Sequence, residues 1–148
     1  MILCFLRAGC ENDAAVAASF ESLGKWELHD LADGLILRPA TAVEECIQFV
    51  VAETRGLWHG RARAMMCRRL KHCELTKEQQ SRLVDAVLDR LASGRFSEQF
   101  YDQLGFVLHA DPQRAFAAAR KNLEAAGTKT HVRKYSEWVL AHEKPAGS

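Results

Sequence analysis

Cys67, His72 and Cys73 are residues whose types could ligate zinc, and they lie close together near the middle of the sequence. A zinc site normally takes two ligands from one short loop, and that loop is missing here, because a helix would project Cys67 and Cys73 from nearly opposite sides. A cysteine–histidine nucleophile pair has no local signature in this chain, and no glycine-rich phosphate loop is present. The sequence therefore predicts no catalytic residue, no metal and no cofactor, and these thiols are expected to pack as small apolar side chains.

Basic side chains are the second chemical feature, and they are concentrated in one segment. Residues 55–72 carry six arginines and lysines and no acidic residue, whereas residues 1–54 carry nine acidic and three basic side chains. On the helix expected within residues 55–72, the cations gather on and beside one polar face. We call this surface the basic ridge, and its members are Arg61, Arg63, Arg68, Lys71 and His72. The last expected helix adds Arg133 and Lys134.

The basic ridge could contact a partner or could be an ordinary solvated face. Glu98 and Asp102 lie on the helix expected between the ridge and Arg133, so the charge alternates across the proposed surface. Alternation suits pairing between helices better than tracking of a phosphate backbone, which favours a protein over nucleic acid as the partner. Trp58 begins the ridge helix and is a candidate anchor for that partner, although packing at a helix junction is its favoured role.

Arg69 differs from the ridge cations because it lies within the apolar stripe of its own helix, beside Met65, Met66 and Cys73. A buried guanidinium needs a carboxylate, since removal of one member of a buried ion pair costs about 3–5 kcal/mol. A structural ion pair between neighbouring helices is therefore predicted for Arg69. The candidate carboxylates are Glu44, Glu45, Glu98 and Asp102.

Apolar residues recur at helical spacing along the chain and almost never alternate as they would in a half-buried strand, so an all-α fold is predicted. The clearest stripe consists of Leu83, Val84, Val87, Leu88 and Leu91. Gly94 follows it and should end the helix. The expected helices cover residues 12–23, 26–37, 76–93, 97–110, 112–126 and 130–142, with two more around residues 43–51 and 58–72.

Three expected helix starts carry capping residues that lie 35 positions apart. Thr41 and Thr76 each precede a Glu or Gln in capping-box spacing, and Asp111 precedes a proline. The same interval, doubled, relates the dipeptide at residues 62–63 to that at residues 132–133. Two independent landmarks therefore predict tandem helix pairs with one period, and about four pairs would use the whole chain.

This pattern resembles the HEAT and armadillo-like helical repeats. The segment V-R-x-x-S-x-x-x-L at residues 132–140 looks like the second helix of a HEAT unit, although Leu28 and Glu98 stand where the first and third units would have the arginine. The resemblance implies a right-handed α–α superhelix (an α-solenoid) of antiparallel helix pairs, whose second helices line a concave partner-binding face. An irregular helical bundle is the alternative fold.

Length and composition set the broad class. With 148 residues, of which 48% are hydrophobic and 26% charged, the chain can bury one sizeable core. Residues 1–143 are expected to form a single helical-repeat domain, and residues 144–148 a tail. The formal net charge of +1 gives no global preference for nucleic acid or for a membrane surface.

The chain opens on the apolar residues Ile2, Leu3, Phe5 and Leu6. Arg7 follows too soon for a signal peptide or a membrane span, so a cytoplasmic protein with reduced thiols and no membrane contact is expected. Because terminal repeats need a cap, these four apolar residues are predicted to cover the first helix pair.

Two functions fit these observations. The favoured one is a non-enzymatic module that holds another protein on its helical surface, as an adaptor or as the neutraliser of a toxic partner, with its acidic first part available to a basic protein. The alternative is a nucleic-acid binder that resembles the HEAT-like DNA-repair glycosylases and places residues 61–72 on the phosphate backbone. The identity of the partner and the oligomeric state stay open.

Overall fold

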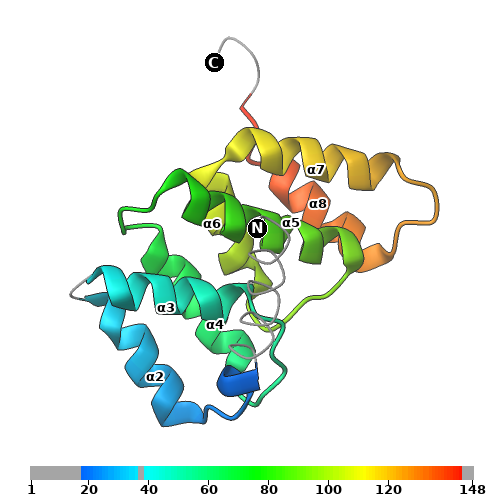
Figure 1. Cartoon of the computed structure of the whole chain (residues 1–148). Coiled ribbons are helices and arrows are strands. Elements are labelled where there is room, and N and C mark those ends of the chain that lie inside the picture. Colours follow the sequence, from blue (N-terminus) through cyan, green and yellow to red (C-terminus); the bar gives the residue numbers. More distant parts are fainter. Residues whose placement is uncertain (1–17, 37–38, 145–148) are drawn as a thin grey trace, which may run out of the picture.

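The computed structural model describes residues 18–36 and 39–144 of the chain (Figure 1). All regular secondary structure within these residues is helical, which confirms the predicted all-α class. The helices are α2 (Lys25–Asp33), the short 3-10 helix η1 (Gly34–Ile36), α3 (Ala40–Val51), α4 (His59–Leu70), α5 (Lys77–Ser93), α6 (Phe100–Ala110), α7 (Pro112–Glu124) and α8 (Thr130–Leu140). Residues 18–21, which precede α2, are also helical.

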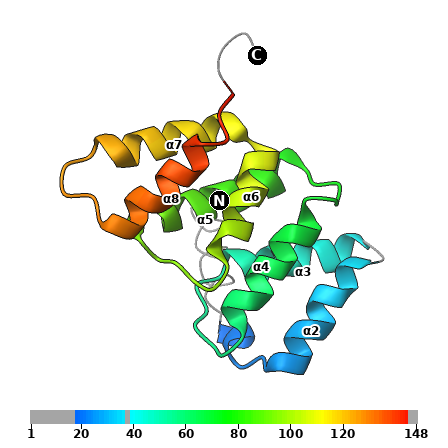
Figure 2. The ribbon, with the colours of Figure 1, turned by 180° about the vertical axis from the view of Figure 1, so that it is seen from behind.

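The helices form two layers, and helices that alternate along the chain are neighbours in the same layer. In one layer α3 contacts α5 and α5 contacts α7, while in the other α2 contacts α4, α4 contacts α6 and α6 contacts α8. Figure 1 shows the first layer in front, and Figure 2 shows the second layer from the opposite side. The consecutive helices α3 and α4, α5 and α6, and α7 and α8 also contact each other, so each such pair joins the two layers.

The first-layer helices begin at regular intervals. The starts of α3, α5 and α7 are Ala40, Lys77 and Pro112, which lie 37 and 35 residues apart. This spacing agrees with the predicted period. The predicted first helix pair begins at residue 12, and residues 1–17 lie outside the described part of the chain, as do the four apolar residues that were predicted to cover that pair.

Two of the three predicted helix caps are present. Thr76 Oγ1 accepts a hydrogen bond from the Gln79 amide at 3.1 Å, and Asp111 Oδ1 accepts one from the Arg114 amide at 3.3 Å. The prediction for Thr41 is wrong, because the cap position is Pro39, two residues earlier, and Thr41 lies within the first turn of α3. Pro39 has no side-chain oxygen that could cap the helix, and its carbonyl accepts the first hydrogen bond of the helix from the Val43 amide at 3.0 Å.

One hydrophobic core extends between the two layers, and most of the predicted stripe residues belong to it. Its largest fully buried apolar side chains include Phe49, Phe100, Phe106, Ile47, Met66 and Leu70. Cys46 and Cys67 are also buried in this core and neither is in a disulfide. Burial raises the pKa of both thiols to about 12, so they remain neutral and pack as apolar groups.

Charged side chains connect neighbouring helices within each layer. Each of the following pairs joins residues 34–38 positions apart, about one helix pair along the chain: Arg61 with Glu98, Arg68 with Asp102, Arg69 with Asp33, Arg82 with Glu44, and Arg90 with Glu53. We call these five pairs the long-range ion pairs. They explain the uneven charge of the sequence, because acidic and basic segments that are separated along the chain meet in space.

Arg69 has a carboxylate partner on another helix, but not one of the four that were expected. Its Nη1 donates to Asp33 Oδ1 at 3.1 Å, which connects α4 to the end of α2. The Arg69 side chain is partly exposed, since it lies at the edge of the α2–α4 contact and not within the core. His29 also hydrogen-bonds to Asp33, at 3.0 Å, and these two contacts lower the pKa of the Asp33 carboxyl.

Candidate functional site: an aromatic groove and an arginine pocket

Two arginines of the basic ridge pair with carboxylates, one in α6 and one in the loop before it. Arg61 Nε donates to Glu98 Oε2 at 2.6 Å, and Arg68 Nη1 donates to Asp102 Oδ2 at 3.2 Å. The alternating charges therefore pair between helices, as the sequence indicated. Arg61 and Arg68 are consequently less available to phosphate groups than free arginines would be.

Arg63 is not a surface residue, which corrects its assignment to the basic ridge. It is only 7% exposed, because α4 packs on three sides against α2, α3 and α6. The buried stripe of α4 is accordingly broader than the sequence suggested and includes Arg63. Its other members at helical spacing are His59, Met66, Cys67 and Leu70.

Arg133 and Lys134 do not extend the basic ridge. Both are exposed on α8, and α8 makes no contact with α4 among the residues that the structure describes. Arg133 differs from Arg63, its predicted equivalent two periods earlier, because no further helix pair follows α8 in the described part of the chain to bury it. Lys71 and His72, at the end of α4, are half-buried and exposed respectively.

The most exposed large apolar side chains near α4 are those of Trp26, Leu57 and Trp58, which are 74%, 79% and 38% exposed. The Lys25 ammonium lies 5.4 Å from the centre of the Trp26 ring and 4.9 Å from that of Trp58. The Arg61 guanidinium lies 5.3 Å from the Trp58 ring. Trp58 is therefore held between two cations, and Lys25 connects it to Trp26.

A groove with a volume of about 310 Å³ lies between α2 and α4, next to Trp58. Its lining combines apolar and basic side chains, and all of its titratable residues are basic. The residues are Lys25, Leu28, His29, Ala32, Trp58, Arg61, Ala62 and Met65. We call this site the aromatic groove.

A rigid loop presents Trp58 at the edge of the aromatic groove. The buried His59 ring hydrogen-bonds to Thr54 Oγ1 at 2.6 Å and to the Leu23 carbonyl at 3.0 Å. Gly56 packs directly on this ring, since a Cβ atom at Gly56 would lie 2.5 Å from His59 Nε2. The chain then places Trp58 at φ 73°, a left-handed conformation that bulky residues rarely adopt. Strain of this kind is concentrated at functional sites.

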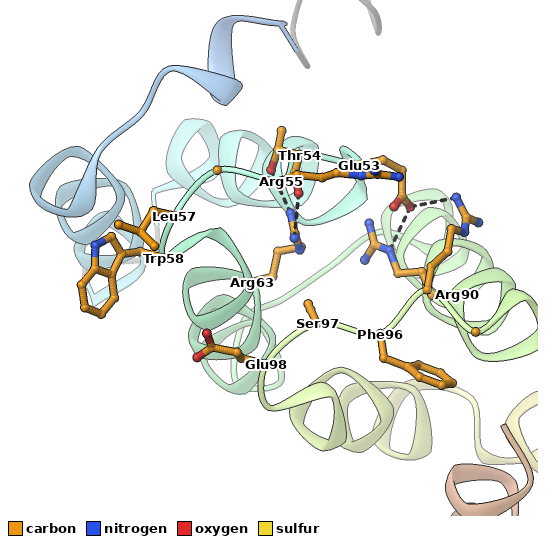
Figure 3. A pocket seen from close by; sticks show the side chains of 14 residues that line it. Glu53, Thr54, Arg55, Leu57, Trp58, Arg63, Arg90, Phe96, Ser97 and Glu98 are labelled. Carbon is orange, nitrogen blue, oxygen red and sulfur yellow. Dashed lines mark hydrogen bonds and ion pairs between the residues drawn. The ribbon is translucent and has the colours of Figure 1, made fainter. Parts of the chain in front are cut away.

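A second concave site, the arginine pocket, lies between the loop before α4 and the loop before α6, and has a volume of about 520 Å³ (Figure 3). Its lining includes four arginines and two glutamates: Arg55, Arg63, Arg90, Arg95, Glu53 and Glu98. In Figure 3 Arg63 extends from α4 and Arg90 from α5 toward the loop that carries Glu53 and Thr54. Gly56, Gly60, Gly94 and Ser97 also line the pocket.

Arg90 is 2% exposed and connects three parts of the fold. Its Nη2 donates to the carbonyls of Val50 and Val51 at 2.6 and 3.2 Å, which satisfies the end of α3. Its Nη1 donates to Gln103 Oε1 at 2.9 Å, and its Nε donates to Glu53 Oε1 at 2.9 Å. Every nitrogen of this guanidinium is used, so Arg90 holds the pocket wall in place.

Arg63 is bound in a different way, because its acceptors are neutral. Nη1 donates to Thr54 Oγ1 at 2.8 Å, and Nη2 donates to the Thr54 carbonyl at 2.9 Å. Among the residues that the structure describes, no carboxylate lies within ion-pairing distance of Arg63. Burial, together with the positive charge of Arg90, lowers the pKa of Arg63 to about 10, so it is still a cation at neutral pH.

Sequence reasoning missed the arginine pocket, although it identified Trp58. The signal that was overlooked is Arg90, which lies within the clearest apolar stripe of the chain, just as Arg69 lies within the apolar stripe of its own helix. The same argument about buried guanidinium groups applied to both residues. Thr54 and the loop glycines carry no comparable signal, since their roles depend on how two loops meet.

No model of a protein family matches the chain, and comparison with curated proteins and with solved structures finds no significant match. Within the described residues, no cluster of three or more side chains is arranged to hold a metal ion. Within the same residues, no helix has both the length and the apolar character needed to span a lipid bilayer.

Proposed function

We propose that this chain is a non-enzymatic helical-repeat module of the HEAT-like, α-solenoid type that holds another protein against its second-layer helices, as an adaptor or a neutralising protein. The observation that carries this proposal is Trp58, a half-exposed tryptophan that a rigid loop holds in a left-handed conformation at the edge of the aromatic groove. Rigid, partly exposed aromatic residues beside a groove are the usual anchors of protein interfaces.

The repeat character of the proposal rests on the two layers and on the long-range ion pairs. In a solenoid each helix pair contacts only its neighbours, so polar contacts should recur at a separation of about one repeat. The separations of 34–38 residues have this property. The right-handed superhelix and its concave face are part of the proposal.

The charge around the aromatic groove indicates an acidic partner segment with an apolar side chain. Lys25, His29 and Arg61 line the groove, whereas Asp33 and Glu98, the carboxylates that contact His29 and Arg61, are not part of its lining. This reverses the expectation that an acidic first half would attract a basic protein. The acidic residues Asp33, Glu44 and Glu53 of that half already pair with arginines of this chain.

Nucleic acid is the second candidate partner, and the basic ridge gives it less support than the sequence did. Arg61 and Arg68 are paired, and Arg63 is buried. A salt titration with short duplex DNA tests this alternative, because binding to phosphates weakens steeply as salt rises. Steep salt dependence that charge reversal at Arg68 removes would favour nucleic acid over protein.

A site-specific photocrosslinker tests the proposal for a protein partner. We expect a crosslinker in place of Leu57 to capture one protein that the same crosslinker in place of Gln113, an exposed residue of α7, does not capture. The captured protein is then purified and its affinity measured. Trp58→Ala should weaken binding by roughly tenfold to a hundredfold, as loss of an interface anchor does, and Gln113→Ala should not change it.

The proposal is wrong if the crosslinker at residue 57 captures nothing beyond what residue 113 captures. It is equally wrong if Trp58→Ala binds the purified protein as tightly as the original chain does. Circular dichroism of the Trp58→Ala variant shows whether the helices remain intact, so that a loss of binding can be assigned to the surface.

A further inference from the structure

The arginine pocket contains more positive charge than its own carboxylates balance. Four arginines and two glutamates line it, and both glutamates already have partners. Glu53 pairs with Arg90 and Arg95, and Glu98 pairs with Arg61. Arg55 carries the remaining exposed cation, since its backbone amide, and not its guanidinium, bonds to Glu21.

Arg63 is the unusual member of this set. A guanidinium that is 7% exposed normally faces a carboxylate, because neutral acceptors compensate only part of the cost of removing a charge from water. Here its hydrogen bonds go to Thr54 and to the Ala52 carbonyl, and its positive face lies 5.9 Å from the Phe49 ring centre. The uncompensated charge lies at the wall of an open cavity.

We infer that the arginine pocket binds a phosphate group, with Arg63 as the buried cation and Arg55 and Arg95 at the entrance. The planar guanidinium donates two parallel hydrogen bonds to phosphate oxygens, which makes arginine the preferred residue for this group. Three of the lining residues, Gly56, Gly60 and Gly94, can present only backbone atoms to the cavity. A volume of about 520 Å³ leaves room for the remainder of a phosphomonoester.

This site is separate from the aromatic groove, although Trp58 borders both. It does not depend on a protein partner, and the two proposals can fail independently. The phosphate could belong to a small molecule or to a phosphorylated side chain, since both present the same dianionic group.

Amide chemical shifts of the isotopically labelled full chain test the inference. Sodium phosphate is added at pH 7 in a buffer whose ionic strength is held constant with sodium chloride. We expect saturable shifts at the Gly56, Gly60, Gly94 and Ser97 amides, and no comparable shifts when chloride replaces phosphate. Shifts that do not saturate, or that chloride reproduces, would overturn the inference.

Matched variants assign the binding to the pocket. Arg63→Gln should weaken phosphate binding roughly tenfold or more, as loss of a charge-assisted hydrogen-bonding partner does. Arg55→Gln removes an exposed cation and should weaken it severalfold without unfolding the chain, which keeps the test valid if Arg63→Gln fails to fold. Arg133→Gln removes the same charge on α8 and should bind phosphate normally. An equal loss in Arg55→Gln and Arg133→Gln would refute a specific pocket.

A phosphoserine tripeptide with blocked ends distinguishes the two sources of the phosphate. Tighter binding of the tripeptide than of inorganic phosphate assigns the pocket to a phosphorylated protein segment. Equal or weaker binding of the tripeptide, with saturable binding of phosphate, assigns it to a small phosphorylated molecule. Both results support the site, whereas failure of both ligands to bind excludes it.

Discussion

At the scale of single residues, the fold depends on a few buried polar groups that apolar patterning does not reveal. Arg90 satisfies the end of α3 and the Gln103 amide, and it anchors Glu53, all from a position within an apolar stripe. The sequence predicted this kind of arrangement for Arg69, which proved to be partly exposed. Periodicity shows that a cation lies in a stripe, but not how deeply the neighbouring helices bury it.

Arg90→Met should destabilise the chain by about 2–4 kcal/mol, because it leaves buried carbonyl groups and the Gln103 amide without their donor. Arg95→Met, which removes an exposed arginine from the same pocket, should cost less than about 1 kcal/mol. Urea unfolding followed by circular dichroism measures both values. Similar losses in the two variants would contradict the role assigned to Arg90.

Cys46 and Cys67 should resist iodoacetamide at pH 8 in the folded chain and react only after denaturation. Their folded pKa of about 12 keeps both thiols protonated, whereas in the unfolded chain they ionise near pH 9. Stability should therefore fall as pH rises above about 9, since only the unfolded state then loses these protons. Peptide mass mapping before and after unfolding checks the modification, and rapid labelling of either folded thiol would contradict it.

At the scale of elements, the sequence predicted helix boundaries well where a particular type of residue marks them. The start of α5 was correct because Thr76 and Gln79 form a capping box, and its end was correct because Gly94 adopts φ 77°. The starts of α4 and α6 have no such marker. Trp58 and Gln99 precede them at φ 73° and 58°, and no rule of sequence assigns bulky residues to that conformation.

Gly56 and Gly105 form a matched pair that tests how rigidly the loop before α4 is held. Gly56→Ala should destabilise the chain by about 1–3 kcal/mol, because the added methyl group collides with the His59 ring. Gly105→Ala lies within α6 with open space around it and should stabilise the chain by about 0.5–1 kcal/mol. Urea unfolding gives both values. A neutral Gly56→Ala variant would show that the loop can move away.

At the scale of the whole molecule, the sequence predicted the helical class, because it follows from apolar residues at helical spacing, and the first-layer helices start 37 and 35 residues apart. It did not predict which charges meet. Residues 1–54 are mainly acidic and residues 55–72 are basic, but Asp33, Glu44 and Glu53 pair with arginines that lie 36, 38 and 37 positions later in the chain. The distribution of charge along this sequence therefore gives little information about the charge of its surface.

Exchange of the charges in one long-range ion pair tests whether these contacts hold neighbouring helix pairs together. Arg82 and Glu44 connect α5 to α3 at 2.6 Å. Glu44→Arg and Arg82→Glu should each destabilise the chain by about 1 kcal/mol, a value that allows for partial exposure, and the double exchange should recover most of the loss. A double variant that is as unstable as the sum of the single variants would show that the pair contributes nothing.

The charges of the second-layer helices also have a consequence for the order of the units. The cationic helix α4 lies between acidic groups on both sides, with Asp33 of α2 on one side and Asp102 of α6 and Glu98 of the loop before α6 on the other. If a folding intermediate or a shuffled chain brought α2 directly against α6, these carboxylates would approach one another. We therefore expect the charges to disfavour any order of helices that makes α2 and α6 neighbours.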